Sequence, residues 1–130
     1  MVKAITWRGK TEEEVKQMDF QEFLRLLPSG ARRSLRRGSN QGFSSQQKRV
    51  MEKVAQDDKN LRTHARNMII VPAMLGKSLK VYNGREWLPV IITLEMLGHY
   101  LGEFSHSRKL VTHGSAGLGA TRSSKAVSAK

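Results

Sequence analysis

Three side chains near the end of the chain have types and a spacing that could support chemistry. Glu95, His99 and Glu103 recur every four residues, so on one helix they would share a face. A carboxylate, an imidazole and a second carboxylate can bind a metal or carry acid–base catalysis. Gly98 and Gly102 would loosen such a helix, and no second cluster completes a coordination sphere. We therefore expect no metal site, and interpret this face as solvated or directed toward RNA.

A glycine-rich segment, 114–121, has the glycine spacing of a phosphate-binding loop, but Ala120 stands where that motif requires lysine. Without the lysine, the β- and γ-phosphates of a nucleotide lose their main cation. The other histidines, His64, His106 and His113, have no Ser/Asp or Cys partners that the sequence can assign, so a catalytic triad is not supported. We expect no enzymatic activity, no cofactor and no small-molecule substrate.

The positive charge of the chain is concentrated in two segments. Lys and Arg number 23 against 11 Asp and Glu, which gives a net charge of +12 at pH 7. Residues 31–51 hold six basic residues and no acid, and the 27 residues after Glu103 hold five Lys or Arg and no acid. Such side chains neutralise phosphates and release counterions, and arginine also stacks on RNA bases. The pattern favours a nucleic acid over a merely solvated basic surface.

Other classes of function are disfavoured by composition. The chain contains no cysteine, which excludes disulfides and zinc fingers and is typical of a reducing compartment. No signal peptide is visible, and the apolar runs at 68–71 and 90–92 are too short to cross a bilayer. We expect a soluble cytoplasmic protein without a membrane partner.

The first half of the chain is expected to be helical. Residues 11–14 form a capping-box pattern that predicts a helix over 12–17, and a similar start at Asp19 predicts a second helix over 20–27 that Pro28 and Gly30 close. The following arginine-rich segment would have only Leu35 as an anchor if it were helical. A further helix is predicted from about 44 to 58.

The second half is expected to supply strands and a last helix. Residues 68–71 read as a short buried strand that ends at Pro72. Residues 78–82 and 86–92 flank Asn83-Gly84, which predicts a β-hairpin, and Pro89 should mark an edge or a bulge. Apolar spacing from 94 to 104 predicts a last helix that Gly102 stops.

Several segments together resemble one known family. Asn83-Gly84-Arg85, Ile92, residues 97–104 and Ser107-Arg108 look like the signature of the small-subunit ribosomal protein nineteen family, whose eukaryotic members are numbered fifteen. Arg37-Gly38, Gly42-Phe43 and residues 66–72 and 74–76 extend the similarity to about residues 35–109. The segment 13–37 and the tail from His113 to Lys125 resemble the archaeal and eukaryotic branch. The ending 126–130 differs from the usual eukaryotic one, which favours an archaeal member.

The resemblance implies an α+β fold with a small three-stranded mixed sheet and packed helices. It would comprise a helical N-terminal extension (1–34), a core domain (35–109) and a basic, flexible C-terminal tail (110–130). Family membership further implies a structural protein in the head of the small ribosomal subunit that binds the 3′ domain of small-subunit rRNA. Ribosomal protein thirteen of the same subunit would be a partner, and the tail would approach tRNA at the decoding region. A free-standing nucleic-acid-binding regulator is the alternative.

Phosphate and sugar contacts are expected from basic side chains of both acid-free segments and of the region around the sheet. These predicted RNA-binding residues are Arg32, Arg33, Arg36, Arg37, Lys48, Arg49, Arg62, Arg66, Lys77, Lys80, Arg85, His106, Arg108, Lys109, His113, Arg122 and Lys125.

Overall fold

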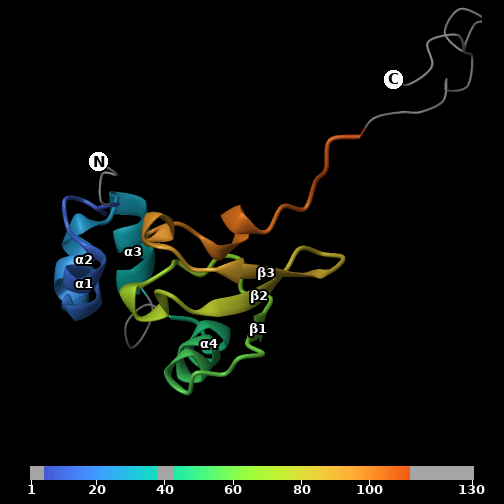
Figure 1. Ribbon diagram of the computed structural model, residues 1–130, viewed down its shortest axis with the longest axis horizontal. Coiled ribbons are helices and arrows are strands. Elements are labelled where there is room, and N and C mark those ends of the chain that lie inside the picture. Colours follow the sequence, from blue (N-terminus) through green and yellow to red (C-terminus); the bar gives the residue numbers. More distant parts are fainter. Residues whose placement is uncertain (1–4, 38–42, 112–130) are drawn as a thin grey trace, which may run out of the picture.

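Helices and a small sheet share one hydrophobic core in a computed structural model that describes residues 5–37 and 43–111 of the 130-residue chain (Figure 1). The helices are α1 (Glu12–Gln17), α2 (Phe20–Leu26), α3 (Ser29–Arg37) and α4 (Ser45–Ala55). The strands are β1 (Arg62–Thr63), β2 (Ser78–Tyr82) and β3 (Trp87–Ile91), and short 3₁₀ turns lie at Pro72–Met74, Leu94–Met96 and Leu101–Phe104. The α+β class is confirmed.

The sheet has the order β1-β2-β3, with β1 parallel and β3 antiparallel to the central β2. The predicted hairpin is confirmed, but its turn differs from a two-residue Asn83-Gly84 turn: Tyr82 pairs with Trp87 across residues 83–86, where Gly84 has φ +99° and Asn83 does not have a positive φ. Pro89 lies on β3, an edge strand, where its missing N–H removes no hydrogen bond from the middle of the sheet. The sheet is mixed, as expected.

The prediction of a strand at residues 68–71 is wrong. Residues 68–71 are buried as expected, but they form only an isolated bridge between Ile69 and Tyr100 and do not join the sheet. Their backbone hydrogen bonds are made with residues 98–101: Ile70 N donates to His99 O, and Leu101 N donates to Met68 O. The sheet instead takes β1, a two-residue strand too short to give an alternating pattern.

The predicted last helix is also wrong. Residues 94–104 form two 3₁₀ turns separated by Gly98, which has φ +81°. The amides of Gly98 and Leu101 donate to Ile70 O and Met68 O, so they are not available for helical bonds to the residues four positions earlier. Long-range pairing with residues 68–70 has replaced the local helix.

The helices α1, α2 and α4 begin close to their predicted starts, but α2 and α4 end earlier than predicted. α1 occupies the predicted residues, and Thr11 and Glu14 form its capping box. α2 ends before Pro28, but Gly30 does not close it, because this glycine lies inside α3. α4 ends at Ala55 and not at 58, since Asp57 turns into the left-handed region at φ 54°.

A single hydrophobic cluster connects the N-terminal helices to the sheet. Phe23 and Leu27 from the α2 region and Leu35 of α3 belong to the same buried cluster as Val54 of α4 and Val81 of β2. Trp7 packs against this cluster and stacks on Phe23, with ring centroids 5.5 Å apart. Within the described ranges, no helix has the length and apolar content needed to span a membrane.

Candidate nucleic-acid interface

Helix α3 presents arginines to solvent and buries two apolar side chains, Ala31 and Leu35. Ala31 and Leu35 are 7% and 3% exposed, so the helix has one more anchor than the sequence suggested. Arg33, Arg36 and Arg37 are exposed on the other faces. None of these three takes part in an ion pair within the described ranges. α3 therefore offers three guanidinium groups to an external anion.

Arg32 differs from its neighbours on α3 because it is half-buried and engaged inside the protein. Its Nη2 donates to Leu27 O at 2.9 Å and to Arg25 O at 3.2 Å. These carbonyls lie at the C-terminal end of α2, where backbone acceptors lack helical partners. Arg32 thus caps α2, and the structure gives it a role in holding α2 against α3.

A second basic surface lies between α4 and β1. A groove there is lined by Gln46, Arg49, Val50, Lys53, Arg62, Thr63 and His64, and no acidic side chain lines it. Arg49 and Arg62 were predicted to bind RNA, whereas Lys53 was not. It lies one helical turn after Arg49 and could have been found by that i, i+4 spacing. Lys48 is half-buried on the same helix.

An aromatic cluster that was not predicted from the sequence adjoins this groove. The ring centroids of His64, Tyr82 and Trp87 lie 4.7 to 5.1 Å apart, in tilted and edge-to-face pairs. The guanidinium carbon of Arg62 lies 5.9 Å from the centre of the Trp87 ring, within cation–π range. The hairpin pattern placed Tyr82 and Trp87 close together, but His64 joins them only through β1, the strand that was not predicted.

Arg66 was predicted to lie on a basic surface, but its guanidinium is bound within the protein. Its Nη1 donates to Tyr82 O and to Ser105 Oγ at 2.8 and 2.9 Å. Its Nη2 donates to Gly102 O and to Ser105 O at 3.0 and 2.6 Å. The guanidinium of this half-buried side chain is therefore engaged by the protein itself, and it joins the end of β2 to the last 3₁₀ turn.

The other predicted residues around the sheet fall into two groups. Lys77 is engaged internally, since its Nζ donates to Val54 O at the end of α4 and pairs with Asp57 Oδ1 at 2.5 Å. Lys80 is half-buried on β2, and Arg85 is exposed in the hairpin turn. Asn83 Oδ1 accepts hydrogen bonds from the backbone N–H of Arg85 at 2.9 Å, which fixes this turn and leaves the arginine side chain outside it.

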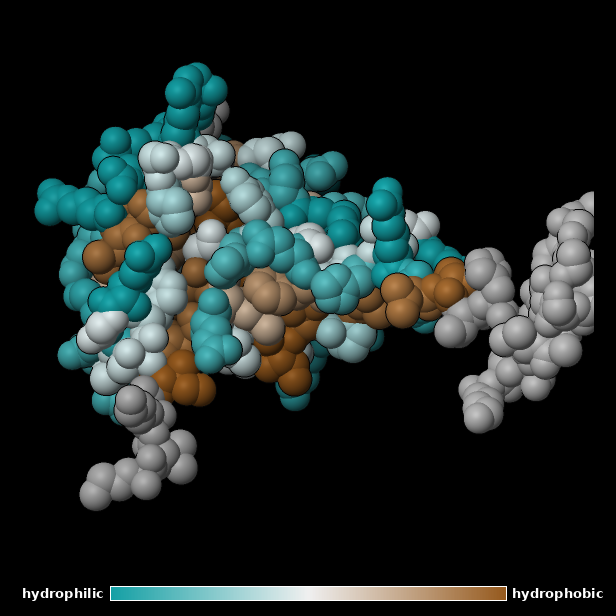
Figure 2. All heavy atoms as spheres, turned by 90° about the horizontal axis from the view of Figure 1, so that it is seen from above, coloured by the Kyte–Doolittle hydropathy of each residue, from teal (hydrophilic) through white to brown (hydrophobic). Residues whose placement is uncertain are grey.

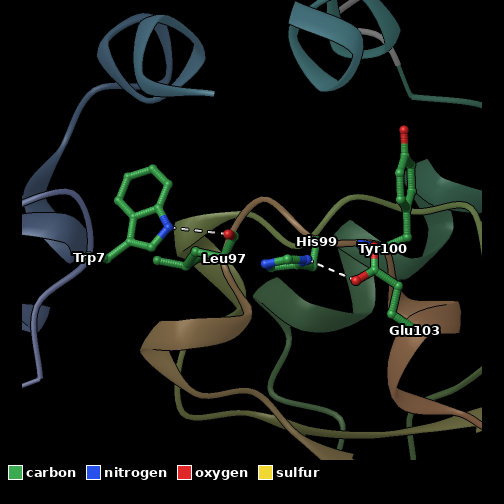
Figure 3. Close-up of polar contacts among 5 residues, drawn as sticks. All are labelled: Trp7, Leu97, His99, Tyr100 and Glu103. Carbon is green, nitrogen blue, oxygen red and sulfur yellow. Dashed lines mark hydrogen bonds and ion pairs between the residues drawn. The ribbon is translucent and has the colours of Figure 1, made fainter. Parts of the chain in front are cut away.

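The candidate acidic and histidine set is only partly assembled. His99 Nδ1 lies 2.8 Å from Glu103 Oε2, and Glu103 Oε1 accepts from Tyr100 N (Figure 3). Glu95 lies on a separate 3₁₀ turn before Gly98, and no metal-binding group of three His, Asp or Glu side chains occurs among the described residues. On the same loop, Leu97 O accepts a hydrogen bond from Trp7 Nε1 at 3.2 Å. These contacts secure the loop.

The chain leaves the folded body after Ser105. His106, Arg108 and Lys109 are all exposed, and residues 106–111 run away from the sheet as the orange segment of Figure 1. Viewed from above, much of the body carries hydrophilic side chains, with smaller hydrophobic patches between them (Figure 2). His113, Arg122, Lys125 and the glycine-rich segment 114–121 lie outside the described residues.

Comparison with known proteins shows a close similarity along most of the chain. A family model described as "Ribosomal protein S19" matches residues 33–113. The "Small ribosomal subunit protein uS19" of Methanococcoides burtonii is 51% identical over 125 residues, covering 96% of this chain and 88% of the relative. The protein of the same name from Methanoregula boonei is 48% identical over 125 residues, covering 96% and 87%. Both relatives are archaeal, so the predicted resemblance is confirmed together with its archaeal character.

Proposed function

The chain belongs to the ribosomal protein S19 family, and on that basis we propose that it works as a structural constituent of the small ribosomal subunit. This family is structural and not enzymatic, and its archaeal members carry the small-subunit name. The protein acts in translation as a cytoplasmic ribosomal component and contacts rRNA. The finer proposal is that it binds the 3′ domain of small-subunit rRNA, in the head of the subunit.

The observation that carries RNA binding is the number of basic side chains left without an internal acidic partner. Among the predicted contacts that the structure describes, only Lys77 forms an ion pair. The side chains proposed to contact phosphate are therefore the exposed or half-buried ones without such a partner: Arg33, Arg36, Arg37, Lys48, Arg49, Arg62, Lys80, Arg85, His106, Arg108 and Lys109. Cations that a fold leaves unpaired are suited to neutralising phosphates.

Three of the predicted contacts take a different role in the proposal. Arg32, Arg66 and Lys77 donate to backbone carbonyls of the protein itself. We propose that they act in RNA binding indirectly, by fixing α3, the last 3₁₀ turn and α4. For His113, Arg122 and Lys125 the proposal rests on the composition of their acid-free segment alone.

The tail and the partner protein complete the proposal. Residues 106–111 are exposed and lead away from the body, which supports an arm that contacts nucleic acid outside the folded domain. We propose that the segment 110–130 lies near tRNA at the decoding region and that ribosomal protein thirteen is a neighbour. The division into an extension (1–34), a core domain (35–109) and a tail (110–130) is retained as part of this proposal.

Affinity measured against salt concentration tests the proposal directly. The full chain would be titrated with a transcript of the 3′ domain of archaeal small-subunit rRNA over a range of potassium chloride concentrations. Affinity should fall steeply, with a slope of roughly 0.7 to 0.9 per neutralised phosphate in the double-logarithmic plot. A transcript of an unrelated rRNA domain, matched in length, serves as the control. Equal affinity for both transcripts, or no salt dependence, would contradict the proposal.

A further inference from the structure

The aromatic cluster of His64, Tyr82 and Trp87 is positioned as a contact surface and not as part of the core. His64 is exposed, and the other two rings are half-exposed. The two tryptophans of the chain differ in this respect: Trp7 packs against the central hydrophobic cluster, whereas Trp87 is not among the side chains packed there. A cluster whose role was only to fill the core would be expected to bury its rings.

The electrostatic surroundings of the cluster select an anionic ligand. Arg62 lies over Trp87 and also lines the neighbouring groove, together with Arg49 and Lys53. No acid lines this groove, whereas the groove at the C-terminal end of α4 includes Asp57 and Asp58. A phosphate would therefore be attracted to the first groove, and a basic peptide would not.

Aromatic rings beside a basic groove are suited to one type of RNA. Paired bases are stacked inside a duplex and cannot reach a protein ring, whereas bases of loops and bulges can stack on Trp, Tyr, His or Arg. Arg62 joins the two surfaces, because its guanidinium lies over the Trp87 ring and its side chain also lines the groove.

We propose that the cluster of His64, Tyr82 and Trp87, with Arg62, binds an unpaired base of RNA, while Arg49 and Lys53 bind its flanking phosphate. This inference rests on the proposed rRNA-binding function and adds to it the class of nucleotide that this surface takes. Stacking has little dependence on sequence, since every base has a π-face. The site should therefore select an unstacked base and not a particular sequence.

Fluorescence of Trp87 can test the site directly. The substitution Trp7→Phe leaves Trp87 as the only tryptophan of the chain. The variant would be titrated with a single-stranded RNA of about ten nucleotides, within the site sizes known for single-strand binders. A duplex of the same length and inorganic polyphosphate serve as controls. We expect the single strand to quench Trp87, and both controls to leave its emission unchanged while still binding the basic surface.

A second measurement requires no change at Trp7. In the otherwise unchanged protein, His64→Ala should weaken binding of the single strand by between about fivefold and about a hundredfold, the range for loss of one stacked base. Tyr100→Ala is the matched control, because Tyr100 is an aromatic side chain that is 37% exposed and lies outside the cluster. Melting temperatures should stay unchanged for His64→Ala, which separates loss of contact from loss of folding.

The outcomes separate this inference from the proposed function. Salt-dependent binding of the rRNA domain with no quenching of Trp87, or with His64→Ala equal to Tyr100→Ala, overturns the stacking site and leaves the function intact. Quenching by polyphosphate or by duplex equal to that by the single strand also overturns it. Failure of the unchanged protein to bind the 3′-domain transcript instead contradicts the proposed function itself.

Discussion

Arg66 illustrates how the role of a single residue depends on a neighbour distant in sequence. As part of a sequence it is one of many basic residues in a strongly basic chain. In the fold, Gly102 O and Ser105 O lie close enough to accept hydrogen bonds from its guanidinium. Ser105 is itself completely buried, so its carbonyl and hydroxyl oxygens depend on the guanidinium for these hydrogen bonds.

Substitution of Arg66 should therefore affect stability, and substitution of Arg85 should affect RNA binding. Arg66→Ala leaves the buried carbonyl and hydroxyl oxygens of Ser105 without their donor, and we expect it to lower the free energy of unfolding by about 3 kcal/mol. Arg85→Ala should change stability by less than about 0.5 kcal/mol, as is usual for exposed positions, while weakening RNA binding. Urea denaturation and RNA titration of both variants measure the two effects. Equal stability of the two variants would refute the internal role of Arg66.

At the scale of elements, the loop around Gly98 shows where sequence patterns stop being informative. The apolar spacing at 94–104 matches a helix, yet the amides of Gly98 and Leu101 bond to the segment 66–70 instead. Residues 68–71 were recognised as buried from their composition, and residues 94–104 as having an apolar face, but which backbone groups the two segments pair with depends on the whole fold. By contrast, α1, α2 and the hairpin are determined by local signals such as the capping box at Thr11 and the Asn83-Gly84 turn.

This loop should tolerate no side chain at position 98. Gly98 has φ +81°, and a Cβ atom there would lie 2.7 Å from Leu27 Cδ2. Gly98→Ala should therefore destabilise the protein by more than the roughly 1 kcal/mol expected for the positive φ alone. Gly30→Ala is the matched control, since Gly30 lies in α3 with nothing within 4 Å of an added Cβ. That change should raise stability slightly, by up to about 1 kcal/mol.

Thermal unfolding of the two alanine variants provides the comparison. The melting temperature should fall for Gly98→Ala and stay level or rise for Gly30→Ala. If both variants melted at the temperature of the unchanged protein, the close approach of Gly98 to Leu27 would not be a feature of the molecule in solution.

Helix α3 should contribute to RNA binding through charge. The double substitution Arg33→Gln and Arg36→Gln removes two exposed cations, so the slope of log affinity against log salt should decrease by roughly 1.4 to 1.8. Lys10→Gln with Lys16→Gln removes the same charge from side chains already paired with Glu22 and Glu12. This control should change the salt slope less than the double substitution in α3 does. Salt titrations against the 3′-domain transcript measure both, and equal slopes would exclude α3 from the interface.

At the scale of the molecule, the sequence predicted a folded body and two acid-free basic segments, and resemblance to a family supplied the function. The N-terminal helices and the hairpin followed from local patterns, and the α+β class followed from the family resemblance. The short β1 strand and the His64–Tyr82–Trp87 cluster did not, because both arise from contacts between residues far apart along the chain. Sequence composition also could not separate internally engaged cations such as Arg66 and Lys77 from those on the surface.

Removal of residues 110–130 should weaken RNA binding and leave the thermal stability of the body unchanged. Leu110 is fully exposed, so a chain ending at Lys109 loses no described core contact and should melt at the same temperature. The deletion removes Arg122, Lys125 and Lys130, and the salt slope should therefore decrease by roughly 2 to 3. Calorimetry and RNA titration measure the two properties. A large loss of thermal stability would refute the proposed division into body and tail.

The central claim, a structural role in the small ribosomal subunit, is tested most directly by where the protein is found in the cell. Extracts of the source organism would be separated on a sucrose gradient, and the protein quantified by mass spectrometry against other small-subunit proteins. We predict that it sediments with small subunits and whole ribosomes at close to one copy per subunit. A protein found mostly in the soluble fractions, at low copy number relative to small subunits, would contradict a structural role and favour a free-standing regulator.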